Sequence, residues 1–246
     1  MSALQVRQLY KRFGGIEAVA GVSLDIAAGE RRVLIGPNGA GKTTLFHCIA
    51  GTDLASAGTV TLFGKDITRL PAHARARSGL ARTFQITNLF PLLTVMENVL
   101  LAAAAAADIG LALMRSMASY GALHERGAKL LADWGLAEKP SVQVRHLSYG
   151  EQRQLELALA LAGEPKILLL DEPTAGLSAA ESARVVGMVQ ALPRRMTILM
   201  VEHDMDVAFG LADRISVLHM GRIVAEGDER AIRADPQVSE IYLGAQ

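Results

Sequence analysis

The N-terminal part of the chain alternates apolar and polar residues with the period of two that is typical of β-strands. Val22, Leu24 and Ile26 share one face of such a strand, and polar residues stand between them. The same alternation occurs at residues 5–10 and 59–63, and a short apolar strand is expected at 32–35. We therefore predict a β-rich N-terminal part.

The middle of the chain carries start signals of helices instead. Thr94 with Glu97 and Ser148 with Glu151 have the spacing of capping boxes, in which a hydroxyl and a carboxylate bond to each other's backbone amides. A further helix is expected at about 122–134. Because these helices lie between two groups of β-like segments, an inserted helical lobe is the simplest layout.

The last part of the chain alternates strands and helices. Residues 166–170 and 196–201 are apolar runs of the kind that fill buried parallel strands. Between these two runs, Ser178 and Glu181 are expected to cap the start of a helix. Nearer the C-terminus, residues 215–218 and 222–225 flank a short turn. This alternation predicts an α/β fold, with a parallel sheet covered by helices on both faces.

The composition is that of a globular protein. The chain has 246 residues, of which 50% are hydrophobic and 20% charged, and the formal net charge is zero. A neutral total argues against a general nucleic-acid binder. Cys48 is the only cysteine, which excludes an intrachain disulfide and suits a reducing compartment. The first residues lack the basic start and apolar core of a secretory signal.

The segment nearest to a membrane span is residues 99–114. Its centre is alanine and Asp108 interrupts it, whereas a spanning helix needs about 20 mostly apolar residues. We expect a soluble helix here, and we expect any work at a membrane to depend on another subunit.

The strongest chemical signal is the run G-P-N-G-A-G-K-T, which fits G-x-x-x-x-G-K-[ST] between a strand and a helix. Glycines let backbone amides turn toward phosphate oxygens, and the helix start adds a positive dipole end. Lys42 is expected to reach the β- and γ-phosphates of ATP, and the Thr43 hydroxyl to bind Mg²⁺. The predicted ATP-binding residues of this loop are Gly36, Pro37, Asn38, Gly39, Ala40, Gly41, Lys42, Thr43 and Thr44.

A phosphate loop needs a carboxylate for its metal. Asp171 and Glu172 follow four apolar residues, at the predicted end of a buried strand. Asp171 is expected to hold Mg²⁺, directly or through water, and Glu172 to orient and polarise the attacking water. Helix capping or surface charge is the alternative interpretation of such a pair.

With these motifs the chain resembles the ABC ATPase family over nearly its whole length. The run Leu147, Ser148, Tyr149, Gly150, Glu151 lies before the acidic strand and is similar to the family's signature loop, usually LSGGQ. In the family this loop contacts the γ-phosphate bound by a second subunit, so that two ATPs lie in a head-to-tail dimer. Taken alone, the run would be an ordinary capping box.

The resemblance assigns roles to three more residues. Gln85 matches the family's glutamine loop, which senses the metal or the attacking water. His203 matches the switch histidine that contacts the γ-phosphate. Phe13 resembles the aromatic residue that stacks on adenine; Tyr10 is a weaker candidate, and core packing is the rival interpretation.

Two positions depart from the family pattern. Tyr149 replaces the first glycine of the signature loop, and because tyrosine disfavours positive φ, an ordinary backbone is expected there. Ser178 stands where the family often has the aspartate that crosses the dimer interface, so coupling between the two ATP sites is expected to differ.

The resemblance implies a P-loop NTPase with a RecA-like core, an N-terminal antiparallel β subdomain and an inserted helical subdomain. The expected division is 1–90 and 164–246 for the catalytic core and 91–163 for the helical subdomain, within one ATPase domain. The C-terminal run from residue 201 is similar to ATPase subunits of branched-chain amino-acid importers.

That similarity implies a motor subunit on the cytoplasmic face of the inner membrane. Its expected partners are integral membrane permease subunits, a second ATPase subunit, identical or different, and indirectly a periplasmic solute-binding protein. The alternatives are a urea or short-amide importer, a lipid-type exporter, and a soluble ABC ATPase acting on nucleic acid or ribosomes.

Overall fold

The computed structural model describes residues 1–83, 89–106 and 121–243. The chain forms two compact units. The first unit comprises Met1–Arg82, Lys166–Glu172 and Leu192–Gln246, and the second comprises Thr83–Pro165 and Pro173–Ala191. The finer division into subdomains stays a prediction.

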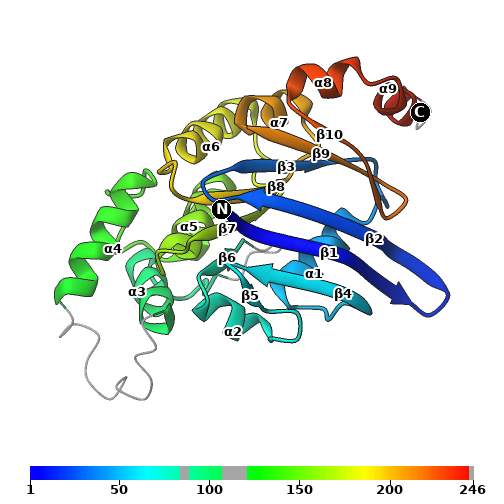
Figure 1. Ribbon diagram of the computed structural model, residues 1–246. Coiled ribbons are helices and arrows are strands. Elements are labelled where there is room, and N and C mark those ends of the chain that lie inside the picture. Colours follow the sequence, from blue (N-terminus) through cyan, green and yellow to red (C-terminus); the bar gives the residue numbers. More distant parts are fainter. Residues whose placement is uncertain (84–88, 107–120, 244–246) are drawn as a thin grey trace. The chain divides into compact units, whose positions relative to one another are not determined.

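The N-terminal β-rich part is an antiparallel sheet in the first unit. Its four strands have the order β2-β1-β4-β5, and Figure 1 shows β1 and β2 as a long ribbon with β4 beside β1. Val22, Leu24 and Ile26 are all buried, which confirms the face predicted from their alternation. The strands are β1 (Ser2–Phe13), β2 (Ile16–Ala27), β4 (Ala57–Leu62) and β5 (Lys65–Asp66).

A six-stranded sheet of the order β10-β9-β3-β8-β7-β6 carries the apolar runs. Its neighbours are parallel except for β10, which forms an antiparallel hairpin with β9 across the short turn noted in the sequence, so the predicted parallel sheet is confirmed. Every residue of β3, β7 and β8 is buried, which explains the apolar runs of β7 and β8, whereas β3 also buries Arg31 and Arg32 at its start. The strands are β3 (Arg31–Ile35), β6 (Leu80–Arg82), β7 (Ile167–Asp171), β8 (Thr197–Val201), β9 (Arg214–His219) and β10 (Arg222–Gly227).

Helix α1 (Lys42–Ala50) contacts strands of both sheets, because it packs against β1 and β2 as well as β6 and β7. Leu45, Phe46 and Ile49 on this helix are fully buried, and they belong to the core that joins the two sheets. The other helices of the first unit are α2 (Ala72–Arg77), α7 (Met205–Leu211), α8 (Glu229–Ala234) and α9 (Pro236–Leu243).

The described part of the second unit is helical. The capping boxes predicted at its helix starts are present: the Glu97 amide donates to Thr94 Oγ1 at 3.2 Å, and Glu97 Oε2 accepts from the Thr94 amide at 2.7 Å. Among the described residues no helix is both long and apolar enough to cross a membrane. The elements are α3 (Val95–Ala106), α4 (Gly121–Asp133), the 3-10 turn Val144–His146, α5 (Tyr149–Leu161) and α6 (Ala179–Ala191).

Candidate functional site

The loop between β3 and α1 encloses the ammonium group of Lys42. Lys42 is the first residue of α1 and is buried, and its Nζ donates hydrogen bonds to the carbonyl oxygens of Gly36 at 2.6 Å and Pro37 at 3.0 Å. Burial lowers the pKa of Lys42, while the nearby carboxylates of Glu172 and Asp171 raise it. The predicted phosphate loop and acidic pair therefore lie within electrostatic reach of each other.

The backbone of this loop fits a phosphate group. Gly41 has φ +100°, and a Cβ atom there would lie 2.3 Å from the Ala18 carbonyl oxygen, so only glycine allows this approach. No side chain caps the start of α1, and its first turn carries no acidic residue. The amides and positive dipole end of this helix thus suit an anion. The loop is exposed at Asn38 and Gly39 and buried at Gly36 and Ala40. It is partly buried at Pro37, Thr43 and Thr44.

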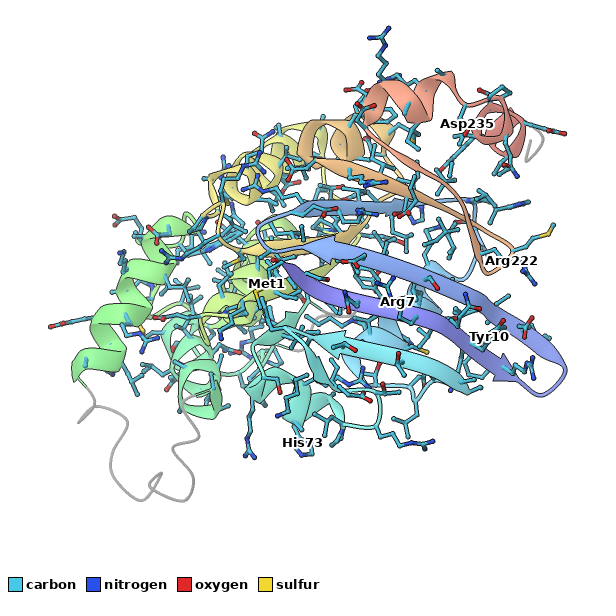
Figure 2. All side chains as sticks on the ribbon, viewed as in Figure 1. Met1, Arg7, Tyr10, His73, Arg222 and Asp235 are labelled. Atoms are coloured by element: carbon cyan, nitrogen blue, oxygen red, sulfur yellow. The ribbon has the colours of Figure 1, made fainter. Side chains whose placement is uncertain are left out.

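Strand β2 and the β9–β10 turn brace the loop from outside. The Gly221 amide donates to the Ala40 carbonyl at 2.9 Å, and the Ala20 amide donates to the Gly221 carbonyl at 2.8 Å. Figure 2 shows Tyr10, which pairs with Ala20, and Arg222 at the same end of the first unit. These bonds hold the loop in place through backbone atoms alone.

The C-terminal helix α9 also lies beside the loop, which the sequence did not indicate. A cavity of about 580 Å³ is lined by Pro37 and Asn38 on one side and by Gln237 and Ile241 of α9 on another. Burial raises the pKa of Tyr242 to about 12, opposed by a hydrogen bond with the Gly36 backbone. Tyr242 thus contacts the loop where it leaves β3.

Asp171 ends β7 with a fully buried carboxylate. Its Oδ2 accepts from Nη2 of Arg82, the last residue of β6, at 3.0 Å, and both side chains are almost inaccessible to solvent. The carboxylate of Asp171 and the hydroxyl of Thr43 are oxygen donors of the kind that Mg²⁺ prefers, so the donor set fits this metal. The pairing with Arg82 was missed in the sequence, because nothing there links the two strand ends.

Glu172 and His203 are brought together by neighbouring strands. His203 Nε2 lies 2.5 Å from Glu172 Oε1. Glu172 has φ +48°, an uncommon conformation for a side chain of this kind, and its amide donates to the Val201 carbonyl at 3.0 Å. Since β7 and β8 are adjacent and parallel, both residues leave the carboxyl edge of the sheet, where ligands bind in such folds.

Phe13 and Tyr10 have different surroundings. The Phe13 ring is 49% exposed and the Lys11 ammonium lies 4.8 Å from its centroid, so core packing does not explain this residue. The Tyr10 hydroxyl instead fills the space beside Gly21, where an added Cβ would lie 2.8 Å from it. Gln85 lies outside the described residues.

The run of residues 147–151 lies in the second unit. Ser148 caps α5: its Oγ accepts from the Glu151 amide at 3.3 Å, while Glu151 Oε2 accepts from the Ser148 amide at 3.0 Å. A hydrogen bond from Lys139 to Glu151, followed by those from Ser148, holds the pKa of the Glu151 carboxyl below its usual value, although burial opposes this. Leu147 and Gly150 are buried, Ser148 and Tyr149 are exposed, and Tyr149 has the ordinary helical backbone that was expected.

Comparisons with known proteins agree with this geometry. The family model described as ABC transporter matches residues 19–175. The high-affinity branched-chain amino acid transport ATP-binding protein LivG of Salmonella typhimurium is 42% identical, over 98% of this chain and 97% of the relative.

Two solved structures of ATP-binding cassettes are also similar. One, the ADP conformation of a cassette of an ABC transporter, has a TM-score of 0.88 and 31% identity and covers 99% of both chains. The other is a dimeric post-hydrolysis state bound to ADP and Pi, with a TM-score of 0.78 and 28% identity over 92% of this chain and 98% of the other.

Proposed function

We propose, because the chain belongs to the ABC transporter family, that it is the ATP-hydrolysing motor subunit of an importer for branched-chain amino acids. The proposed ATP hydrolysis rests on the contact between His203 Nε2 and Glu172 Oε1 at 2.5 Å. The Glu172 carboxylate also lies within electrostatic reach of the Lys42 ammonium. The amino-acid substrate is supported by the 42% identity to LivG over nearly the whole chain.

In this proposal the chain's own residues position ATP and water. Lys42 and the backbone N–H groups of the loop, which every residue of 36–44 except Pro37 carries, bind the phosphates, and Phe13 stacks on adenine. Thr43, Asp171 and Gln85 would hold Mg²⁺, and this cation would supply positive charge that stabilises the negative charge developing on the phosphate during hydrolysis.

Hydrolysis then depends on Glu172 and His203. The water oxygen bonds to the γ-phosphorus, the bond to the bridging oxygen of ADP breaks, and a water proton moves toward the Glu172 carboxylate. Inorganic phosphate and ADP are the products. His203, which is 44% exposed on its side chain, is placed to orient Glu172 and to contact the γ-phosphate.

The working unit is a dimer in which the Ser148-capped start of α5 of one subunit contacts the ATP held by the other. The Ser148 hydroxyl and the backbone N–H groups at the start of α5 provide a second anion site. The dimeric cassette with ADP and Pi, 28% identical, supports this arrangement. We propose the same ATPase domain organisation as predicted above, with the helical part at 91–163.

Coupling to transport requires membrane partners. The phenyl ring of Phe90 is 57% exposed next to α3, and we propose it as part of the surface that contacts permease subunits. The chain then lies on the cytoplasmic face of the inner membrane, with a periplasmic solute-binding protein as an indirect partner and no nucleic acid.

The proposal is tested by uptake in a deletion strain of the source organism. Complementation with the wild-type chain should restore uptake of labelled leucine, whereas the Glu172→Gln variant should not, because the base for the attacking water is removed. Glu138→Gln, a change of an exposed carboxylate, is the matched control. Restored uptake of urea instead of leucine would reject the substrate, and an active Glu172→Gln variant would reject the catalytic role.

A further inference from the structure

The first residue of α5 is bonded to the segment between β7 and α6, which comprises residues 173–178 and is called the connecting segment here. Tyr149 Oη donates a hydrogen bond to the Ala175 carbonyl oxygen at 3.2 Å. Both residues belong to the second unit. Because Tyr149 remains 52% exposed, its ring is not held by burial and this hydrogen bond is a specific contact.

Gly176 is shaped to receive the tyrosine ring. Its φ is +76°, a conformation that side chains other than glycine rarely adopt. A Cβ atom at this position would lie 3.2 Å from Tyr149 Cε1 and 3.3 Å from Tyr149 Oη. The absence of a side chain at 176 therefore makes room for the aromatic ring at 149, and the two residues fit each other.

One further hydrogen bond joins the connecting segment to the same helix, and another joins it to α6. Arg153, one turn into α5, donates from Nε to the Pro173 carbonyl at 3.1 Å. Glu181 accepts from the Ser178 amide at 3.0 Å, and an added Cβ at Gly150 would lie only 2.3 Å from Glu181 Oε1. Hydrogen bonds thus join the beginning and the middle of the connecting segment to α5, while its end is bonded to Glu181 of α6, whose carboxylate lies beside Gly150.

The residues at the two ends of this arrangement are functional in the proposed role. Ser148, the cap of α5, immediately precedes Tyr149, and Glu172 immediately precedes Pro173. Glu172 has φ +48°, a conformation that persists only where the surrounding chain holds it. The next residue, Pro173, is held by its hydrogen bond from Arg153 of α5, so the start of α5 and the chain that leaves Glu172 are joined by one hydrogen bond and one peptide bond.

We infer that Tyr149 is a positioning residue that couples the two ATP sites, an inference that rests on the proposed dimer. Ser148 of a subunit faces the ATP of the other subunit, whereas Glu172 serves the ATP of its own. Tyr149 holds the connecting segment against the start of α5. It therefore links binding of ATP by the other subunit, which Ser148 contacts, to the alignment of Glu172 at the ATP of its own subunit.

The contact itself is tested by a double-mutant cycle on the stability of the full chain, with Tyr149→Ala, Gly176→Ala and the double variant. We expect Gly176→Ala to lower the folding equilibrium constant about 30-fold when Tyr149 is present but only about fivefold when residue 149 is Ala. The difference isolates the clash with the ring from the strain of the backbone. Gly187→Ala, at a helical glycine with no atom within 4 Å, is the matched control.

The coupling is tested by ATP hydrolysis of the transporter assembled with its membrane subunits, well below the melting temperatures. Tyr149→Ala should lower kcat about tenfold, because Glu172 is no longer aligned by the other site. Affinity for a fluorescent ADP analogue should stay within about twofold, since ADP lacks the γ-phosphate that the start of α5 would contact and the phosphate loop lies in the first unit. Tyr149→Phe, which keeps the ring and loses the hydroxyl, should retain most of kcat.

Each outcome judges a different statement. Additive effects of Tyr149→Ala and Gly176→Ala would show that the ring and the glycine do not fit each other, which rejects the inference at its base. If kcat of Tyr149→Ala stays within twofold of wild type, the coupling between the two ATP sites is rejected, although the contact between Tyr149 and Gly176 is not. If the wild-type assembly hydrolyses no ATP, the proposed function fails instead, while the stability cycle still judges the contact.

Discussion

Arg75 is expected to be a main stabilising residue of the helix that follows the phosphate loop. It is fully buried on α2, and its Nη1 donates to the carbonyl oxygens of Cys48 at 2.6 Å and Ile49 at 2.7 Å, near the end of α1. Nε and Nη2 donate to Leu70 and Thr68. The last carbonyls of a helix have no partner within it, so this guanidinium satisfies groups that would otherwise be buried unbonded.

The substitution Arg75→Met keeps much of the volume and removes every donor. Each hydrogen bond from a charged donor contributes about 1.5–3 kcal/mol, but burial of the guanidinium opposes this gain and lowers its pKa. A buried carbonyl left without its donor costs about 1–3 kcal/mol, so the loss of these bonds together should cost about 3–5 kcal/mol. For a chain of 150–250 residues this corresponds to a fall in Tm of about 10 °C.

The measurement is thermal unfolding, followed by circular dichroism, of Arg75→Met beside Arg77→Met, an exposed residue of the same helix. The Arg77 variant should unfold within about 2 °C of wild type, as surface substitutions usually do. Arg75→Lys should be intermediate, because one ammonium cannot replace a fork of donors. If Arg75→Met also stays within about 2 °C, the carbonyls are satisfied in another way and the reasoning is refuted.

Three further outcomes are expected. Phe13→Ala should raise KM for ATP about fivefold through lost stacking while Tyr10→Phe leaves it unchanged, as measured by steady-state hydrolysis; equal effects would reject Phe13 as the adenine contact. Arg82→Met should lower Tm and shift half-saturation by Mg²⁺ to lower concentration, because Asp171 loses a competing cation; an unchanged Mg²⁺ titration would contradict this. Burial raises the pKa of Cys48 to about 11. At pH 8, Ellman's reagent should therefore react at least about 100-fold more slowly with the folded chain than with the unfolded chain. Equal rates would contradict the burial of the Cys48 thiol.

The parts of the fold that the sequence predicted are those decided by local patterns. The strands β7 and β8 are buried along their whole length and consist almost entirely of apolar residues, so an apolar run is a sufficient signal for each. The capping boxes at Ser148 and Ser178 depend on two residues three positions apart, and a short pattern contains all that is needed. The phosphate loop is likewise contained in one continuous segment.

The parts that could not be predicted depend on partners far apart in the chain. Strand β6 has only three residues, too few to show any period. Arg75 and Arg82 are charged residue types that normally lie on the surface, and their burial follows only from the carbonyls and the carboxylate that surround them. Tyr149 is visible in the sequence as a departure from the family pattern, but its contact with Gly176 is not.

The charges proposed to act on ATP all have partners inside the first unit, and this affects how binding should be understood. Lys42 donates to loop carbonyls, Asp171 accepts from Arg82, and Glu172 contacts His203. Phosphate or Mg²⁺ must replace these contacts, so the free energy of binding is the difference between two sets of charged hydrogen bonds. Because the chain holds these groups in fixed geometry before binding, little reorganisation is left for the hydrolysis step, which is where preorganised charge lowers a barrier most effectively.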